Sequence, residues 1–265
     1  MSEPHPRRRR GEISFQTRRR IFLLGGAGVG ALLVWGLTGL PDFGTFSPLY
    51  GQLVDHLAVP QRSTTDVVTA VNFDYRGFDT LGEEFILFAA VLGLTLLLRE
   101  TRDERLGAID DDAHQRRPPP TSPALRLLTV LLVPFTVLLA IYITAHGHLT
   151  PGGGFQGGVV AASGLLLIYI GGEYLALRRV RPLSLVEVSE AGGAAAFVLI
   201  GMAGIIFAAA FLENFLPVRT PGSLVSAGTI PLLSFAVGFE VAGGFVLLLS
   251  EFLDQLLIVR RRSGK

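Results

Sequence analysis

Six long apolar segments dominate the sequence and constrain its fold more than any other feature. Each is close to the ~20 residues that a helix needs to cross a bilayer. Of the 265 residues, 49% are hydrophobic and only 17% are charged, too few charges to cover a soluble domain. The sequence therefore predicts an all-α membrane protein with about six transmembrane helices. The segments are 21–40, 81–98, 125–145, 157–177, 188–212 and 230–257.

The positive charges indicate how these spans are oriented. When tails and connections are assigned to alternate sides, one side holds 20 of the 23 arginines and lysines, and the other holds only Arg62, Arg76 and Arg219. Positive charge collects on the cytoplasmic side of membrane proteins, so both termini are predicted to be cytoplasmic. The Arg-rich start could belong to a targeting segment, but no small-residue cleavage site follows 21–40, so a retained first span is expected.

Composition divides the chain into two membrane domains. Residues 99–123 contain three consecutive aspartates and three consecutive prolines, which is typical of a solvated linker. Before this linker we expect a two-span domain, 21–98, with an external loop at 41–80. After it we expect a four-span domain, 124–258. Nucleic-acid binding is not expected, because a membrane span directly follows the basic start. Basic cytoplasmic tails are expected at 1–20 and 259–265.

Part of the external loop has the pattern of an interfacial helix. Ser63 and Asp66 fit a capping box, and apolar residues over 67–78 then recur at roughly helical spacing. Residues 71–75 alternate between apolar and polar, so a strand is the alternative there.

Two acidic residues within predicted spans are candidates for an ion or proton path. Glu84 follows a capping box of Thr80 and Glu83, where the helix dipole favours a carboxylate but the apolar surroundings oppose its ionised form. An interfacial charge is the alternative for Glu84. Glu240 lies near the middle of its span, where an ionised carboxylate facing lipid costs at least ~2.5 kcal/mol. Its carboxylate is expected to point into a close helix contact, because the residues one turn away are small or modest in size: Ala236, Val237, Gly243 and Gly244.

The stretch HGHLTPGGGFQGGVVAA, at 146–162, is the most unusual in the sequence. It lacks the Lys-Ser or Lys-Thr ending of a phosphate-binding loop and faces outward, so nucleotide binding is not expected. His146 and His148 have no third ligand nearby, so interfacial histidines are expected and no metal site is predicted. Along the following helix, small residues share one stripe, which predicts close packing against another helix, in this chain or in a neighbouring protein of a complex. The stripe is Gly157, Ala161, Gly164, Ile168 and Gly171.

The remaining residues argue against enzyme activity. The chain has no cysteine, which excludes disulfides, thiolate metal sites and cysteine catalysis. No set of nucleophile, base and orienting group emerges, so neither catalysis nor a cofactor is expected. His146 and Glu173 complete the candidates for the ion path, with an interfacial position as the alternative for each.

The glycine-rich stretch carries a resemblance to a known family. HGHLTPGGGFQGGVVAASG, together with TPGSLVSAGTIPLLSFAVGFEVAGGF at 220–245, strongly resembles the MrpB or MnhB component of the Mrp type of multisubunit cation/proton antiporter. The same kind of component is found in related membrane-bound hydrogenase complexes. The resemblance covers most of 124–257. In the first half, VVTAVNFDYRGFDTLGEEFILFAA resembles the short E-type membrane domain often found at the C-terminal end of the large MrpA component.

The resemblance implies a function and a set of partners. It implies an accessory subunit in the bacterial plasma membrane, assembled with large complex I-like subunits and small membrane subunits. Such complexes exchange cytoplasmic Na⁺, or sometimes K⁺, for external H⁺. The resemblance maps Asp79 and Glu84 onto an acidic element, FDTLGE. The family motif maps onto Pro151, Gly152, Gly153, Gly154, Phe155, Gln156, Gly157 and Gly158.

Two other functions stay open. One is a self-sufficient carrier that works as a homo-oligomer, although the chain shows no convincing inverted repeat. The other is a structural subunit in the membrane arm of a hydrogenase-like or other complex I-related redox complex.

Overall fold

The computed structural model describes residues 15–40, 44, 49–98, 121–180 and 183–262, and the chain forms two compact units, 1–49 and 50–265. The first unit contains one long helix, α1 (Phe15–Thr38). Its large apolar side chains are exposed, Phe22 by 77% and Trp35 by 75%. A helix that is apolar all round and exposed suits a lipid environment.

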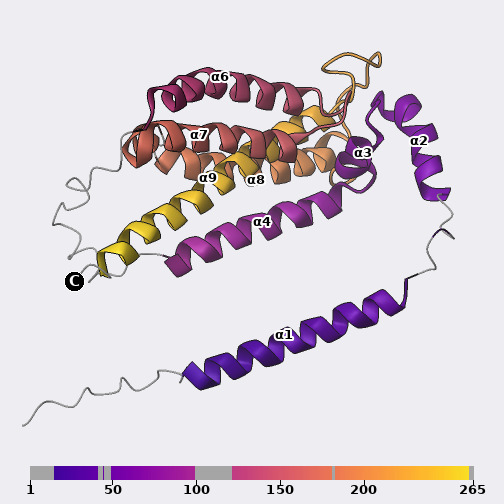
Figure 1. Ribbon diagram of the computed structural model, residues 1–265. Helices are drawn as coiled ribbons and strands as arrows, with labels where there is room; N and C mark the ends of the chain where they lie inside the picture. The colour runs from indigo at the N-terminus through magenta and orange to yellow at the C-terminus, as the bar shows by residue number, and fades with distance from the viewer. Residues whose placement is uncertain (1–14, 41–43, 45–48, 99–120, 181–182, 263–265) are drawn as a thin grey trace, which may run out of the picture. The chain divides into compact units, whose positions relative to one another are not determined.

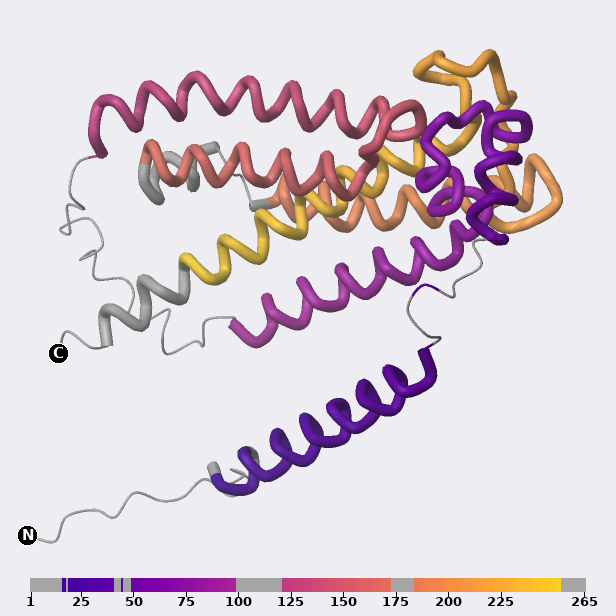
Figure 2. The backbone as a smooth tube through the Cα atoms, turned by 45° about the vertical axis from the view of Figure 1, so that its right-hand side comes forward, coloured from indigo at the N-terminus to yellow at the C-terminus, as the bar shows by residue number. Residues whose placement is uncertain are grey.

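Five long helices form a bundle in the second unit (Figures 1 and 2). α9 crosses the middle of this bundle and packs against the other four helices. Within its membrane-spanning stretch 61% of the residues are buried, against 11–33% in the other four. α9 is therefore the axis around which the bundle is built. The helices are α4 (Gly77–Leu98), α6 (Pro123–Ala145), α7 (Gly154–Val180), α8 (Leu183–Phe207) and α9 (Ile230–Arg262).

The predicted fold class is confirmed. Six helices in the described ranges are long and apolar enough to cross a membrane, and they coincide with the six predicted segments. No strand occurs among these residues, only an isolated bridge between Val218 and Ala227. The chain is thus a multi-pass membrane protein.

Two predicted helix boundaries are wrong. α8 ends at Phe207 and not at 212, because the chain turns back there: Leu212 adopts φ 63° and its N–H donates to the Gly201 carbonyl. α7 begins at Gly154 and not at 157. The glycine-rich turn is therefore shorter than expected, and its last glycines form the first turn of α7.

Three short elements lie at the external end of the bundle: α2 (Leu49–Arg62), α3 (Val67–Ala70) and the π-helix η1 (Val71–Tyr75). α3 and η1 confirm that this segment is helical, and the strand alternative is wrong. The helix cap is Asp66 and not Ser63, which takes φ 50° just after α2. The pattern did not predict α2, whose interior contains a proline.

The second predicted capping box is also wrong. α4 begins at Gly77, one turn before the expected start. The Thr80 hydroxyl donates to the Asn72 carbonyl at 2.6 Å and so ties α4 to η1. Glu83 is exposed.

The small-residue stripe on α7 packs within the chain. Gly157, Gly164 and Gly171 face Thr144, Thr136 and Thr129 of α6 in turn. On another side of α7, Gly154 and Gly158 lie against the backbone of α9. Close approach on two sides needs glycine, because a Cβ at most of these positions would overlap the neighbouring helix.

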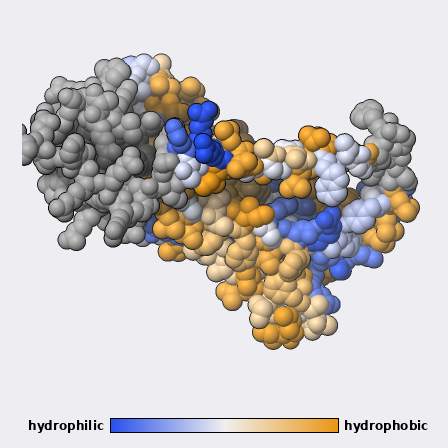
Figure 3. Space-filling view, turned by 90° about the horizontal axis from the view of Figure 1, so that it is seen from below, coloured by the Kyte–Doolittle hydropathy of each residue, from blue (hydrophilic) through white to orange (hydrophobic). Residues whose placement is uncertain are grey.

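Much of the bundle surface remains apolar. Figure 3 shows hydrophobic residues over much of the described surface of the chain, with hydrophilic residues gathered in smaller patches. On α6, Leu131, Phe135 and Leu138 are 61–67% exposed. Such a surface is suited to lipid or to neighbouring membrane proteins.

Candidate functional site

Three glutamates from three different helices lie buried inside the bundle. Glu84 of α4 is 4% exposed, Glu190 of α8 is 6% exposed and Glu240 of α9 is fully buried. The sequence predicted Glu84 and Glu240 as candidates and missed Glu190. The signal available for Glu190 was a glutamate two residues inside the predicted span 188–212.

Glycines bring two of these glutamates into the contact between α8 and α9. Gly193 of α8 faces the backbone of Ala236 and Glu240, and Gly243 of α9 faces the backbone of Glu190. Each glutamate thus sits where the other helix contributes a glycine. The predicted close contact around Glu240 is confirmed, and α8 is the partner helix.

Glu84 reaches Glu240 across the contact between α4 and α9. Their carboxyl groups lie within hydrogen-bonding reach of each other. Glu190 is close enough to Glu240 to act on it electrostatically. One turn or so further along, Val91 of α4 packs on Gly244 of α9, beside the Glu190 side chain. The three side chains therefore form one group, which we call the carboxylate row.

No basic side chain pairs with the carboxylate row in the part of the chain that the structure describes. Glu84 Oε2, Glu190 Oε1 and both carboxyl oxygens of Glu240 have no hydrogen-bond donor there. The ion pairs found among described residues lie elsewhere, at the external end. A buried carboxylate without a partner is costly, so such a group carries a proton or binds a cation.

The carboxylate row is staggered through the membrane. At 1.5 Å per residue, Glu84 lies about 10 Å below the external end of α4, and Glu240 about 15 Å below that of α9. Glu190 lies about 25 Å below the external end of α8. The row thus descends from the outer part of the bundle toward its cytoplasmic side.

The other predicted path residues are not brought to the row. Asp79 forms an ion pair with Arg76 on the surface at the start of α4. His146 caps α6, where its Nδ1 lies 3.2 Å from the Tyr142 carbonyl and its ring stacks on Tyr142. The side chain of Glu173 lies outside the described residues.

His148 is buried in the glycine-rich turn and connects this turn to two other segments. Its ring is 1% exposed, and Nε2 lies 3.1 Å from the Ser223 carbonyl. Its own carbonyl accepts from the backbone N–H groups of Thr65 and Asp66. Burial lowers the pKa of His148. A neutral histidine therefore joins the turn to the segment before α3 and to the loop before α9.

The family-motif residues have packing roles at this joint. Gly153 has φ 128°, which only glycine adopts readily, and its N–H donates to the Ile143 carbonyl. Phe155 and Gln156 are exposed, and Phe155 packs edge-on against Phe245. No group of three residues able to hold a metal ion occurs in the described ranges.

Comparison with known proteins identifies the family. A family model described as a domain related to the MnhB subunit of Na⁺/H⁺ antiporter matches residues 124–247. A protein of uncharacterised function from Methanocaldococcus jannaschii is 33% identical over 195 residues, covering 67% of this chain and 72% of the relative. Residues 124–247 are therefore an MnhB-related domain.

Two MnhB relatives bear transport names. The B component of a Na⁺/H⁺ antiporter from Bacillus subtilis is 37% identical over 84 residues, which are 31% of this chain and 58% of the relative. The combined A/B component of a probable K⁺/H⁺ antiporter from Rhizobium meliloti is 34% identical over 124 residues, which are 41% of this chain but 12% of the relative.

Two solved structures share the MnhB fold over most of the chain. One is a chain of the membrane-bound sulfane sulfur reductase, an archaeal respiratory complex, with a TM-score of 0.64, 30% identity and coverage of 89% of this chain and 98% of that one. The other is the Mrp complex from Dietzia sp., with a TM-score of 0.61, 25% identity and coverage of 91% and 26%. Both alignments extend beyond the four-span domain into the first half of the chain.

Proposed function

We propose that this chain, with its MnhB-related domain, is an accessory subunit of a multisubunit monovalent cation/proton antiporter and carries part of the ion route. The observation that carries this proposal is the carboxylate row, three buried acids on three helices with no described basic partner. The transport names of two relatives and the likeness to the Mrp complex support the parent assembly.

The row suits the passage of small positive ions. Two carboxyl groups in hydrogen-bonding reach can share one proton, and releasing that proton leaves a negative site for a cation. Glu84 and Glu240 form such a pair, and Glu190 offers the next carboxyl toward the cytoplasm. Competition between a proton and a Na⁺ or K⁺ ion for the same carboxyls is the simplest basis for exchange.

The surface supports a place within a larger complex. The exposed apolar faces of α4 and α6 are available for sister subunits as well as for lipid. The two-domain division, with an E-type domain joined to a B-type domain, stays part of this proposal. We propose no enzymatic step for the chain itself, since the carboxylate row consists of acids alone.

A second function has a specific observation in its favour. The chain covers 98% of one component of a respiratory sulfur-reducing complex. In that case the same row would serve an ion pump driven by redox chemistry elsewhere in the assembly. Metal analysis of the purified complex separates the two, because sister subunits with iron would indicate the redox complex.

The experiment replaces each buried glutamate by glutamine in the assembled complex. Glu84→Gln, Glu190→Gln and Glu240→Gln are expected to lose most cation-driven proton exchange in membrane vesicles, because glutamine cannot release a proton. The chain supplies matched controls in Glu83→Gln and Glu187→Gln, whose parent side chains are exposed neighbours of the buried ones. These controls should keep exchange near the parent level. Full exchange in all three buried variants would remove the row from the route.

A further inference from the structure

A pocket lies at the external end of the bundle, above the carboxylate row. Its volume is about 320 Å³, and it opens between the start of α4 and the loop that follows α8. The pocket is large enough to hold water and a small cation. Glu84 lies on α4, seven residues below the Gly77 that lines the pocket.

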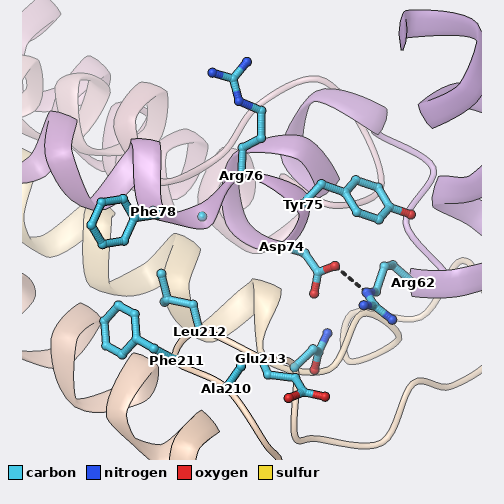
Figure 4. A pocket seen from close by; sticks show the side chains of 11 residues that line it. Arg62, Asp74, Tyr75, Arg76, Phe78, Ala210, Phe211, Leu212 and Glu213 are labelled. Atoms are coloured by element: carbon cyan, nitrogen blue, oxygen red, sulfur yellow. Dashed lines mark hydrogen bonds and ion pairs between the residues drawn. The ribbon is translucent and has the colours of Figure 1, made fainter.

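The charges around the pocket leave one acid without an arginine. Asp74 is paired with Arg62, and Figure 4 shows this pair at one side of the pocket. Arg76 points away from the pocket in the same view and pairs with Asp79. Glu213 has no ion pair among the described residues; one of its carboxylate oxygens accepts from the Ala209 N–H at 2.9 Å. Glu213 therefore gives the pocket a negative charge that no described arginine pairs with.

The floor of the pocket is a leucine in a strained conformation. Leu212 has φ 63°, a region that non-glycine residues rarely enter. Its side chain packs on Gly77 and belongs to the apolar cluster with Phe73 and Phe197. Leu81 of α4 packs against the same cluster, one turn above Glu84. Apolar side chains of this cluster thus lie between Gly77, which lines the pocket, and Glu84 along α4.

A second unusual backbone conformation lies beside Leu212 at this pocket. η1, which contributes Asp74 and Tyr75 to the pocket wall, is a π-helix. π-helical turns are rare overall but frequent at functional sites. A leucine in a left-handed conformation is strained, and such residues cluster at functional sites.

We propose that this pocket is the external mouth of the carboxylate row, that it takes a hydrated monovalent cation beside Glu213, and that Leu212 closes its floor. This inference rests on the proposed function, because a mouth needs a route below it. A cation or proton passes between the pocket and Glu84 when the Leu212 side chain leaves Gly77. Arg62 holds Asp74 in place, so Glu213 is the acid free to meet the ion.

The test uses the absence of cysteine from the chain. Ala210 lines the pocket and is exposed, whereas Ala208 is exposed two residues away and does not line it. Ala210→Cys and Ala208→Cys are placed in the assembled complex and treated from outside with a cationic thiol reagent. Modification of the chain is read by its mass shift.

Modified Ala210→Cys is expected to lose most cation-driven exchange, and external Na⁺ or K⁺ should slow its modification. Modified Ala208→Cys should keep its exchange, with no slowing of its modification by either ion. Three results would each contradict the proposal that the pocket is the external mouth. The reagent fails to reach Ala210→Cys, exchange is unchanged after modification, or both variants lose exchange equally. A further variant, Glu213→Gln, should raise the external cation concentration needed for half-maximal exchange, and an unchanged concentration would remove Glu213 from the site.

The two proposals fail separately. If the glutamine variants of the row lose exchange but modified Ala210→Cys does not, the route stands and its mouth lies elsewhere. If the row proves dispensable while the pocket variant blocks exchange, the pocket leads to a different route.

Discussion

The protein holds its carboxylates in two different ways. At the external end two aspartates each face an arginine, Asp74 with Arg62 and Asp79 with Arg76. Inside the bundle the three glutamates of the carboxylate row face no described basic side chain. An acid beside an arginine has a partner and helps to hold the fold, whereas an unpaired acid between helices is suited to exchanging protons and cations. The comparison separates acids with a structural partner from acids that the proposed route can use.

The largest effect on ion exchange is expected when a basic side chain is placed beside the carboxylate row. Leu87 lies three residues after Glu84 on α4, the spacing that joins Arg76 and Asp79, and packs against both apolar clusters. Leu87→Lys should pair with Glu84 and abolish cation-driven exchange in vesicles, because a fixed positive charge would repel entering cations.

Leu87→Met is the control for packing and should keep its exchange, since the two side chains have similar volumes. If assembled Leu87→Lys still exchanges ions at the parent rate, the absence of a basic partner is not what suits the carboxylate row to ion exchange.

A smaller effect is expected at the external pair. Asp74→Asn leaves Arg62 without its partner and should lower the unfolding free energy by about 1 kcal/mol, a modest value because about a third of the Arg62 side chain is exposed. Arg62→Gln in the same chain should recover part of the loss, measured as a double-mutant cycle in the thermal stability of the complex.

Glu240→Gln should show no such coupling to Arg62. Simple additivity of Asp74→Asn and Arg62→Gln would mean that the external pair is not structural.

The smallest effect concerns the joint at the glycine-rich turn. Because burial lowers the folded-state pKa of His148 below its ordinary value of 6.5, the unfolded chain binds more protons than the folded one below that pH. Stability is therefore fully present above pH 6.5 and declines as the pH falls from there toward the lowered pKa.

His148→Gln should lose this component of the pH dependence, followed as the melting temperature of the complex between neutral and mildly acidic pH. His146→Gln, in the same turn, should retain it. Identical pH profiles for His148→Gln and the parent would assign the acid sensitivity to another group.

Most of the bundle could be predicted from the sequence. Spans of about 20 apolar residues have few alternatives in a membrane, and the helical spacing of Gly157, Gly164 and Gly171 indicated a face that packs closely. Glu240 was predicted correctly as an inward-facing acid because glycines lie one turn away from it on the same helix.

The errors share a physical cause. Glu190 was missed because the glycines that enclose it, Gly243 and Gly244, belong to another helix, and no local pattern records that pairing. Ser63 was given the cap of α3 because local spacing does not show that a preceding helix, α2, ends there. The pocket needed Leu212 to turn back onto Gly77, a contact between residues far apart in the chain.

The central place of α9 has a consequence for biosynthesis. Helices α4, α6, α7 and α8 precede α9 in chain order, yet each packs on it. Until α9 leaves the translocon, the α9-facing glycines of α7 and α8 have no partner, and the acids of α4 and α8 lack the helix that encloses them. A chain that ends before Ile230 would therefore leave the acids of α4 and α8 without the helix that encloses them.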